Sequence, residues 1–258
     1  FICNHCPYVI NIKEKMSQIL NDALKKDFSV FAINSNDSNE YPLDSIQMMK
    51  KDITEYNYKF PYLVDKDQDV AKKFQVTREE QDKFAFSSQQ KALKAQFSNR
   101  FKEEIVNFKI KSKTAEVDFN KDEHPRDGVS LESLSRLKPV FQKNGTVTAG
   151  NASGINDGAA AVSLMSDYEA EKRKLEKLVT IKSWASCGVD PALMGTGPIP
   201  SSKKAMELAG WTVKDVDLFE INEAFAAQSL TVLKTLSIPE EKVNVNGGAI
   251  ALGHPIGA

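Results

Sequence analysis

The sequence predicts an α/β protein, because apolar residues alternate between strand-like and helix-like spacing along much of the chain. Residues 1–77 and residues 178–236 each alternate strand and helix. The composition is that of an ordinary globular protein, with 41% hydrophobic and 27% charged residues. A length of 258 residues is enough for one large domain or two ordinary ones.

The net charge and the number of cysteines limit the classes of binding partner and the cellular compartment that we expect. A net charge of −1 gives no electrostatic footprint for DNA, RNA or an anionic membrane, and the apolar runs are far shorter than a bilayer span. We therefore expect no nucleic-acid or membrane partner. Three cysteines make no disulfide framework, so we expect the reducing cytoplasm. The opening Phe1-Ile2 is typical of the end of a buried strand, and we expect a truncated N-terminus.

The first 77 residues contain the elements of a small α/β unit. Pro7 is placed to start a helix whose apolar residues recur at helical spacing as far as Leu24. The following elements are a strand at 28–33, a polar turn at 34–39, a helix after Pro42, a strand at 62–64 and a helix at 67–74.

The rest of the chain is predicted from local signals in the same way. A long polar helix is expected at 78–100, with Phe84, Ala85, Ser88, Ala92 and Ala95 on its quieter face. A hairpin at 104–118, a helix at 130–137 and a Gly-rich loop at 145–158 follow. Ser166 with Glu169 starts a helix, and Gly210 ends another. The remaining expected elements are strands at 159–165, 178–186 and 216–221 and helices at 201–209 and 224–236.

Two cysteines, Cys3 and Cys6, form the first candidate site, at an expected strand-to-helix turn. Thiols at this spacing can close a disulfide, and a helix N-terminus stabilises the thiolate of the first. From the spacing alone, a zinc site and a pair of unpaired buried thiols remain open.

Three short sequence blocks in the first 77 residues point to the same protein family. They are Phe1-Ile2-Cys3-Asn4-His5-Cys6-Pro7-Tyr8-Val9, Ala32-Ile33-Asn34-Ser35-Asn36-Asp37 and Phe60-Pro61-Tyr62-Leu63-Val64-Asp65. These blocks resemble a thioredoxin-fold redoxin family related to the peroxiredoxins. The resemblance implies a partial thioredoxin-like sheet, with Cys3 as the attacking thiol and Cys6 as the resolving thiol. The first strands of that family and its later Thr-Pro turn are missing from this sequence.

Longer blocks follow in order from residue 78 to residue 258. They are 78–85 with 88–92, Asp122-Glu123-His124-Pro125-Arg126, 145–159, Met194-Gly195-Thr196-Gly197-Pro198-Ile199-Pro200, Glu220-Ile221-Asn222-Glu223-Ala224-Phe225 and 246–257. These blocks resemble the thiolase family, and within it the acetyl-CoA acetyltransferases. The resemblance implies an incomplete thiolase fold. Residues 78–177 would form the C-terminal part of its N-terminal domain, with the CoA-binding loop region, and 178–258 a truncated C-terminal domain.

Four residues are candidates for this second site. His254 lies in a glycine-flanked loop, where no side chain crowds the imidazole. Asn222 follows an apolar strand and precedes a helix, so its amide either faces the crevice at the strand end or caps the helix. By resemblance, His254 activates a nucleophilic cysteine and contributes to an oxyanion hole, which a water held by Asn222 completes. By resemblance, Ser153 contacts the pantetheine arm of coenzyme A and Arg126 its nucleotide end. An ordinary surface cation remains open for Arg126.

The departures from the thiolase pattern concern its cysteines. Cys187 matches neither catalytic position of that family and is expected to be a buried small hydrophobe. Without a nucleophile we expect little or no thiolase turnover from this chain. Each half lacks strands that its core needs, and no linker separates the halves. A seam at residues 76–78 therefore indicates a chimeric fragment as one alternative.

The leading function is thiolase-type acetyl transfer, with condensation to acetoacetyl-CoA or the reverse thiolysis. The alternatives are a thiol–disulfide oxidoreductase acting through Cys3 and Cys6, and a non-catalytic chimera. Coenzyme A and acetyl-CoA are expected as substrates, with no metal and no permanently bound cofactor. The thiolase resemblance implies a homo-oligomer. Because much of the dimer-forming domain is missing from the sequence, we do not expect this chain to assemble in that way.

Overall fold

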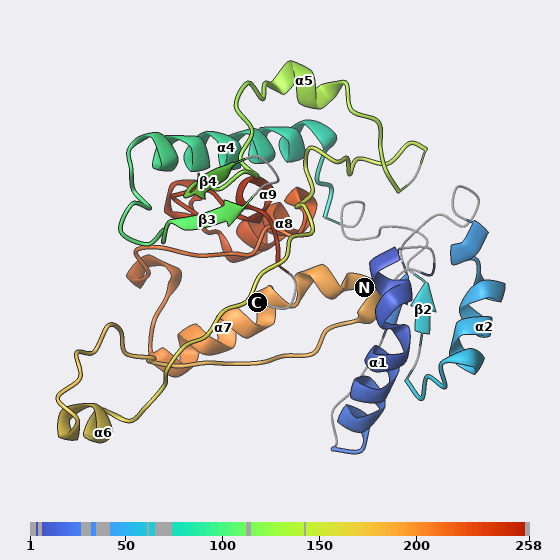
Figure 1. Ribbon diagram of the computed structural model, residues 1–258, viewed down its shortest axis with the longest axis horizontal. Helices are drawn as coiled ribbons and strands as arrows, with labels where there is room; N and C mark the ends of the chain where they lie inside the picture. Colours follow the sequence, from blue (N-terminus) through green and yellow to red (C-terminus); the bar gives the residue numbers. More distant parts are fainter. Residues whose placement is uncertain are drawn as a thin grey trace.

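The computed structural model describes residues 4, 7–26, 32–34, 42–60, 62–64, 74–111, 115–141 and 143–255. Helices and short strands alternate in the first part of the described chain, and helices and irregular segments follow residue 119, a mixed content that fits the α/β prediction (Figure 1). The elements are α1 (Pro7–Leu24), β1 (Ala32–Asn34), α2 (Ile46–Glu55), β2 (Tyr62–Val64), α4 (Arg78–Phe97), β3 (Phe108–Lys111), β4 (Glu116–Phe119), α5 (Leu131–Ser135), α6 (Asp167–Lys172), α7 (Pro198–Ala209), α8 (Ala226–Leu236) and α9 (Ala249–Leu252). None of the described helices is both long and apolar enough to cross a membrane.

The N-terminal elements form a small unit beside the rest of the chain (Figure 1). Strands β1 and β2 pair in parallel, with Ile33 opposite Leu63, and α2 lies between them in the sequence. A separate apolar cluster is centred on Tyr58 and Phe60, with Met16, Leu20, Leu24, Ile53, Tyr56 and Tyr62 packed against it. The start of α1 at Pro7 and the strand at 62–64 are confirmed. Two described strands do not identify a thioredoxin-like sheet, which stays a prediction.

The main core lies between α4, α5 and α8. Helix α8 is buried along residues 226–233, and its apolar side chains meet Phe84 and Ala85 of α4 and Leu134 of α5. Val76, at the predicted seam, is only 4% exposed and belongs to this same core. The seam therefore contributes Val76 to the core, while its neighbours Gln75 and Thr77 are exposed.

Several local predictions are confirmed. Helix α4 begins at Arg78, its N-cap Thr77 forms a capping box with Glu80, and its predicted quiet face is buried. The hairpin is present as antiparallel β3 and β4. Ser166 caps α6, and Gly210 ends α7 with φ +71°, a left-handed conformation that favours glycine.

Three predicted strands are wrong. Residues 159–165 and 178–186 run extended but unpaired, and leave side chains such as Val162 and Leu178 more than four-fifths exposed. Backbone groups in a strand need a partner, and the described chain supplies none to these runs. In the third run, 216–221, one parallel bridge joins Phe219 to Val243. The ladder ends there because Asn244 turns left-handed, with φ +43°.

Glu80 makes the stability of the α4 start pH-dependent. Lys234 Nζ donates to Glu80 Oε1 at 2.6 Å and Thr77 N–H to Oε2 at 2.8 Å, and these hydrogen bonds lower the pKa of the Glu80 carboxyl. A lowered pKa in the folded state stabilises the fold above the unfolded value of about 4.3, and this contribution is lost as pH falls through the folded value.

We therefore predict that Glu80→Gln destabilises the chain near neutral pH by less than about 1 kcal/mol, since both partners are partly in solvent. The difference from the unsubstituted chain should vanish in acid. Urea unfolding between about pH 7 and pH 3 measures this dependence. The neighbouring Glu79→Gln is the control. A difference for Glu80→Gln that stays constant across the pH range would contradict the account.

Candidate functional site

The side chains of Asn222 and His254 meet. Asn222 Nδ2 lies 3.2 Å from His254 Nε2, although 32 residues separate them in the sequence. An amide nitrogen can only donate, so Nε2 accepts and the neutral ring carries its proton on Nδ1. In this tautomer the Asn222 hydrogen bond occupies the Nε2 lone pair. When that bond opens, the same lone pair can take a proton from a thiol.

The loop that carries Ser153 lies against both of these residues. Ala152 bridges to Phe225 on one side, and Ile155 bridges to His254 on the other. The His254 N–H donates to Gly154 O at 2.9 Å, and Asn156 N–H donates to His254 O at 3.3 Å. Ser153, Asn222 and His254 are thus brought into one place by backbone pairing, at the surface of the molecule.

The Ser153 hydroxyl is itself held in this arrangement. Ser153 Oγ and Ser153 N–H both donate to the carbonyl oxygen of Ala224, at 3.1 and 3.0 Å. Ala224 is two residues from Asn222, so Ser153 is fixed relative to the amide. Gly253 has φ +95°, and a Cβ there would collide with Asn156. A glycine before His254 therefore permits the close approach of the loop.

Arg126 lies in a segment that is tied to helices α4 and α9. Its backbone N–H donates to Gln89 Oε1 at 3.0 Å, and Gln89 Nε2 donates to Ile250 O at 3.4 Å. The Arg126 side chain is exposed, as either a ligand-binding or a plain surface role requires. His124, two residues earlier, has Nδ1 2.8 Å from Ala251 O. The backbone at 124–126 is therefore tied to α9, the helix that precedes His254.

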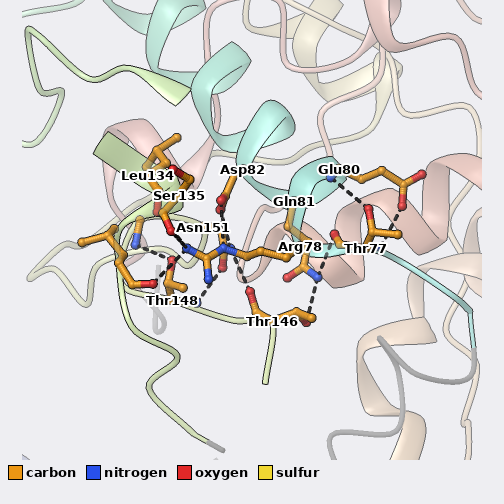
Figure 2. Close-up of polar contacts among 12 residues, drawn as sticks. Thr77, Arg78, Glu80, Gln81, Asp82, Leu134, Ser135, Thr146, Thr148 and Asn151 are labelled. Atoms are coloured by element: carbon orange, nitrogen blue, oxygen red, sulfur yellow. Dashed lines mark hydrogen bonds and ion pairs between the residues drawn. The ribbon is translucent and has the colours of Figure 1, made fainter. Parts of the chain in front are cut away.

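The base of the loop is pinned by the first turns of α4, as Figure 2 shows. Asp82 Oδ2 pairs with Arg78 Nε at 2.8 Å, and Asp82 Oδ1 accepts from Asn151 Nδ2 at 2.9 Å. Arg78 also donates to the carbonyl oxygens of Leu134 and Leu137. Asp82 and Asn151 are both buried, so the loss of either would leave unsatisfied polar groups in the interior.

Sequence reasoning missed three residues of this site. Asn156 holds the backbone at His254, while Glu223 and Asn244 are buried behind Asn222. The run Asn244-Val245-Asn246-Gly247-Gly248 is a turn signal that could have drawn attention to Asn244. Glu223 gives no such signal. Asn222 does not cap α8, because the N-cap position belongs to Phe225.

The acidic side chains beside the pair also affect one another. Partial desolvation raises the pKa of the exposed Glu220 carboxyl, and the charge of Glu223 raises this pKa further, while Lys91 opposes both effects. The Glu220 carboxyl is therefore sensitive to the charge of Glu223.

The cysteine predictions have different outcomes. Cys3 and Cys6 lie outside the described residues, so their redox role stays a prediction. Cys187 is unpaired and half-buried rather than buried, because the strand that it was expected to end is not formed. Among the described residues, no group of three or more His, Cys, Asp or Glu side chains could hold a metal ion.

Comparisons with known protein families give two adjoining matches. The family described as "Thiolase, N-terminal domain" matches residues 32–168, and "Thiolase, C-terminal domain" matches residues 175–258. The first match begins inside the range 1–77 that sequence reasoning assigns to a redoxin. The boundary at residue 78 therefore stays a prediction.

Individual relatives agree with these matches. An acetyl-CoA acetyltransferase of Rhizobium meliloti is 57% identical over 191 residues, which is 74% of this chain and 49% of the relative. The cytosolic acetyl-CoA acetyltransferase of Rattus norvegicus is 53% identical over 193 residues, again 74% of this chain and 49% of the relative. The chain thus spans about half the length of the curated relatives that it matches.

Solved structures show the same similarity. The acetyl-CoA acetyltransferase of Bacillus anthracis aligns with a TM-score of 0.70 and 50% identity, covering 74% of this chain and 48% of that structure. Human mitochondrial 3-ketoacyl-CoA thiolase in complex with CoA aligns with a TM-score of 0.68 and 45% identity, covering 73% and 46%.

We predict that His254 in the free chain carries its proton on Nδ1, whereas free histidine favours Nε2. Asn222→Ala should return the ring to the Nε2–H tautomer, because the amide donor is gone. Long-range proton–nitrogen spectra at about pH 8, above the ordinary histidine pKa of about 6.5, identify the protonated nitrogen. His124, which contacts Ala251 O instead, is an internal reference. An Nε2–H signal for His254 in the unsubstituted chain would contradict the hydrogen bond.

Proposed function

The chain belongs to the thiolase family, and on that premise we propose that it carries the histidine–asparagine part of an acetyl-CoA acetyltransferase site. The reaction is acetyl transfer between thioesters, followed by condensation to acetoacetyl-CoA, or the reverse thiolysis. The substrate is an acyl-CoA, and no resident cofactor takes part. The observation that carries the proposal is the 3.2 Å contact between Asn222 Nδ2 and His254 Nε2.

The geometry of the pair suits the start of this reaction. In the Nδ1–H form, the His254 Nε2 lone pair can accept the proton of a cysteine thiol once the Asn222 hydrogen bond opens, and the resulting thiolate attacks the thioester carbonyl. His254 then carries a proton on Nε2 and becomes a donor, so it no longer bonds to Asn222 Nδ2, and both groups can turn toward a third atom. Two donors that converge on one point can stabilise the oxygen anion of the tetrahedral intermediate, directly or through a water held by Asn222.

The position of Ser153 is consistent with a place for the pantetheine arm. Its loop lies against the pair and consists mainly of small residues, so a narrow acyl-bearing arm could pass close to the backbone. Arg126 would then contact the nucleotide end of coenzyme A, because a guanidinium forms strong, charge-assisted hydrogen bonds with phosphate. Both assignments are parts of the proposal.

The 258-residue chain by itself is proposed to be catalytically silent. The cysteine nearest to the site in the sequence, Cys187, lies in an unpaired run outside the blocks that carry the candidate residues. We place the chain in the cytosol, as the name of the cytosolic rat relative suggests. Assembly into a homo-oligomer is not part of the proposal.

We predict that Arg126→Ala weakens coenzyme A binding by about tenfold, as the loss of a charge-assisted hydrogen bond worth about 1.4 kcal/mol requires. Isothermal titration calorimetry of the 258-residue chain with coenzyme A measures the affinity. The control is Arg136→Ala, since Arg136 is an exposed arginine that pairs with Glu132 on α5. Equal losses for both variants would contradict a specific role for Arg126, and no binding by the unsubstituted chain would contradict the proposed function.

We also predict that the chain does not cleave acetoacetyl-CoA when coenzyme A is added, because the cysteine within the described residues, Cys187, lies outside the blocks that carry the pair. Loss of acetoacetyl-CoA absorbance measures the reaction. Turnover that disappears in His254→Ala and persists in Cys187→Ala would show that another nucleophile serves the site, and would contradict this prediction while supporting the family chemistry.

A further inference from the structure

Glu223 is the most deeply buried carboxylate near the candidate site. It is 1% exposed, and it directly follows Asn222 in the sequence. In the described part of the chain, no lysine, arginine or histidine forms an ion pair with it. A charge removed from water without a counter-ion persists only when its oxygens are well hydrogen-bonded. The burial of Glu223 therefore requires a set of donors that surrounds it.

Three donors from three separate segments supply these hydrogen bonds. Asn244 Nδ2 donates to Glu223 Oε1 at 2.8 Å. Ser88 Oγ on α4 donates to Oε2 at 2.6 Å, and the Ile250 N–H in α9 donates to Oε2 at 3.2 Å. The Gly248 N–H in turn donates to Ser88 Oγ at 3.0 Å. The Ser88 hydroxyl therefore links a second backbone N–H, at the start of α9, to the carboxylate.

The approach of Glu223 to the α9 start depends on Gly248. A Cβ at that position would collide with the Glu223 carboxyl group and with Asn244 Nδ2. Because residue 248 is a glycine, no side chain occupies the space that the Glu223 carboxylate fills. This close approach brings the N–H groups at 248 and 250 within reach.

Asn244 extends the same network to the other side of Asn222. Its Oδ1 accepts from the Ile221 N–H at 2.8 Å, and its Nδ2 donates to the Ile221 carbonyl at 2.7 Å. The side-chain amide thus pairs with Ile221 as a neighbouring strand would. Asn222 is therefore flanked by two anchored residues, Ile221 and Glu223.

We propose that Glu223 is a positioning residue for the Asn222–His254 pair. Its carboxylate ties the segment that carries Asn222 to the start of α9, and α9 leads through Gly253 directly to His254. The catalytic meaning of this role rests on the proposed function, but the geometric claim does not. The carboxylate acts through the two residues that it places and makes no contact with substrate.

A glutamine at position 223 cannot reproduce these contacts, because its amide offers one accepting end and one donating end. If the NH₂ group faces Asn244 Nδ2, two donors oppose each other. If it faces Ile250, the backbone N–H loses its acceptor. Asn244 cannot relieve the conflict by turning over, since both ends of its amide are bonded to Ile221.

The test is the tautomer of His254 in Glu223→Gln, with Glu220→Gln as the matched control. Glu220 is an exposed glutamate three residues earlier, outside the hydrogen bonds described. In Glu223→Gln we expect loss of the Nδ1–H signal of His254, as in Asn222→Ala, while the His124 signals stay in place because α9 remains docked. In Glu220→Gln the Nδ1–H signal should persist.

An unchanged His254 signal in Glu223→Gln, or the same change in both variants, would overturn the proposal. If Glu223→Gln does not fold, Ser88→Ala decides, because it removes one donor and leaves the Gly248 N–H without its acceptor. Loss of the Nδ1–H signal in Ser88→Ala would support the proposal, and its retention would overturn it. A failure of coenzyme A binding would bear on the proposed function and leave this result intact.

Discussion

The buried carboxylate of Glu223 is the constraint around which the well-packed half of this protein is organised. Its oxygens are satisfied by donors from α4, from the turn at 244 and from the start of α9. Because an unsatisfied buried charge is far more costly than a lost surface contact, these segments cannot separate independently. The network therefore acts as a hub that joins segments distant in the sequence.

Helix α4 holds the segments of this network in place. Its buried face carries Gln81, Asp82, Ser88 and Gln89 as well as apolar residues, and each of these polar side chains bonds to a different part of the site. The first two turns hold the loop that leads to Ser153, and the middle of the helix holds the segments at 223 and 250. One rigid helix therefore sets the positions of several short, irregular segments. For this reason the site can have a defined geometry although the described segments around it are irregular rather than parts of a sheet.

Local signals were enough to predict the elements whose ends are chemically marked. Pro7, Ser166 and Gly210 each mark a helix end through the backbone conformation or hydrogen bond that they favour. The three unformed strands show the limit of such signals, because a strand is completed only by a partner. The sequence also indicated His254 and Asn222 through glycine flanks and a strand end. Glu223 could not be predicted, because its burial depends on donors at 88, 244 and 250 that only the fold assembles.

The central claim is that the Glu223 network is one cooperative unit with the core. Native-state hydrogen exchange of the amides of Ile221, Gly248 and Ile250 tests it most directly, since each donates to a side chain of this network. The account predicts that these three amides exchange together, as slowly as amides of the buried helix α8. Exchange at separate rates, as fast as amides of the hairpin β3–β4, whose side chains are all exposed, would contradict it.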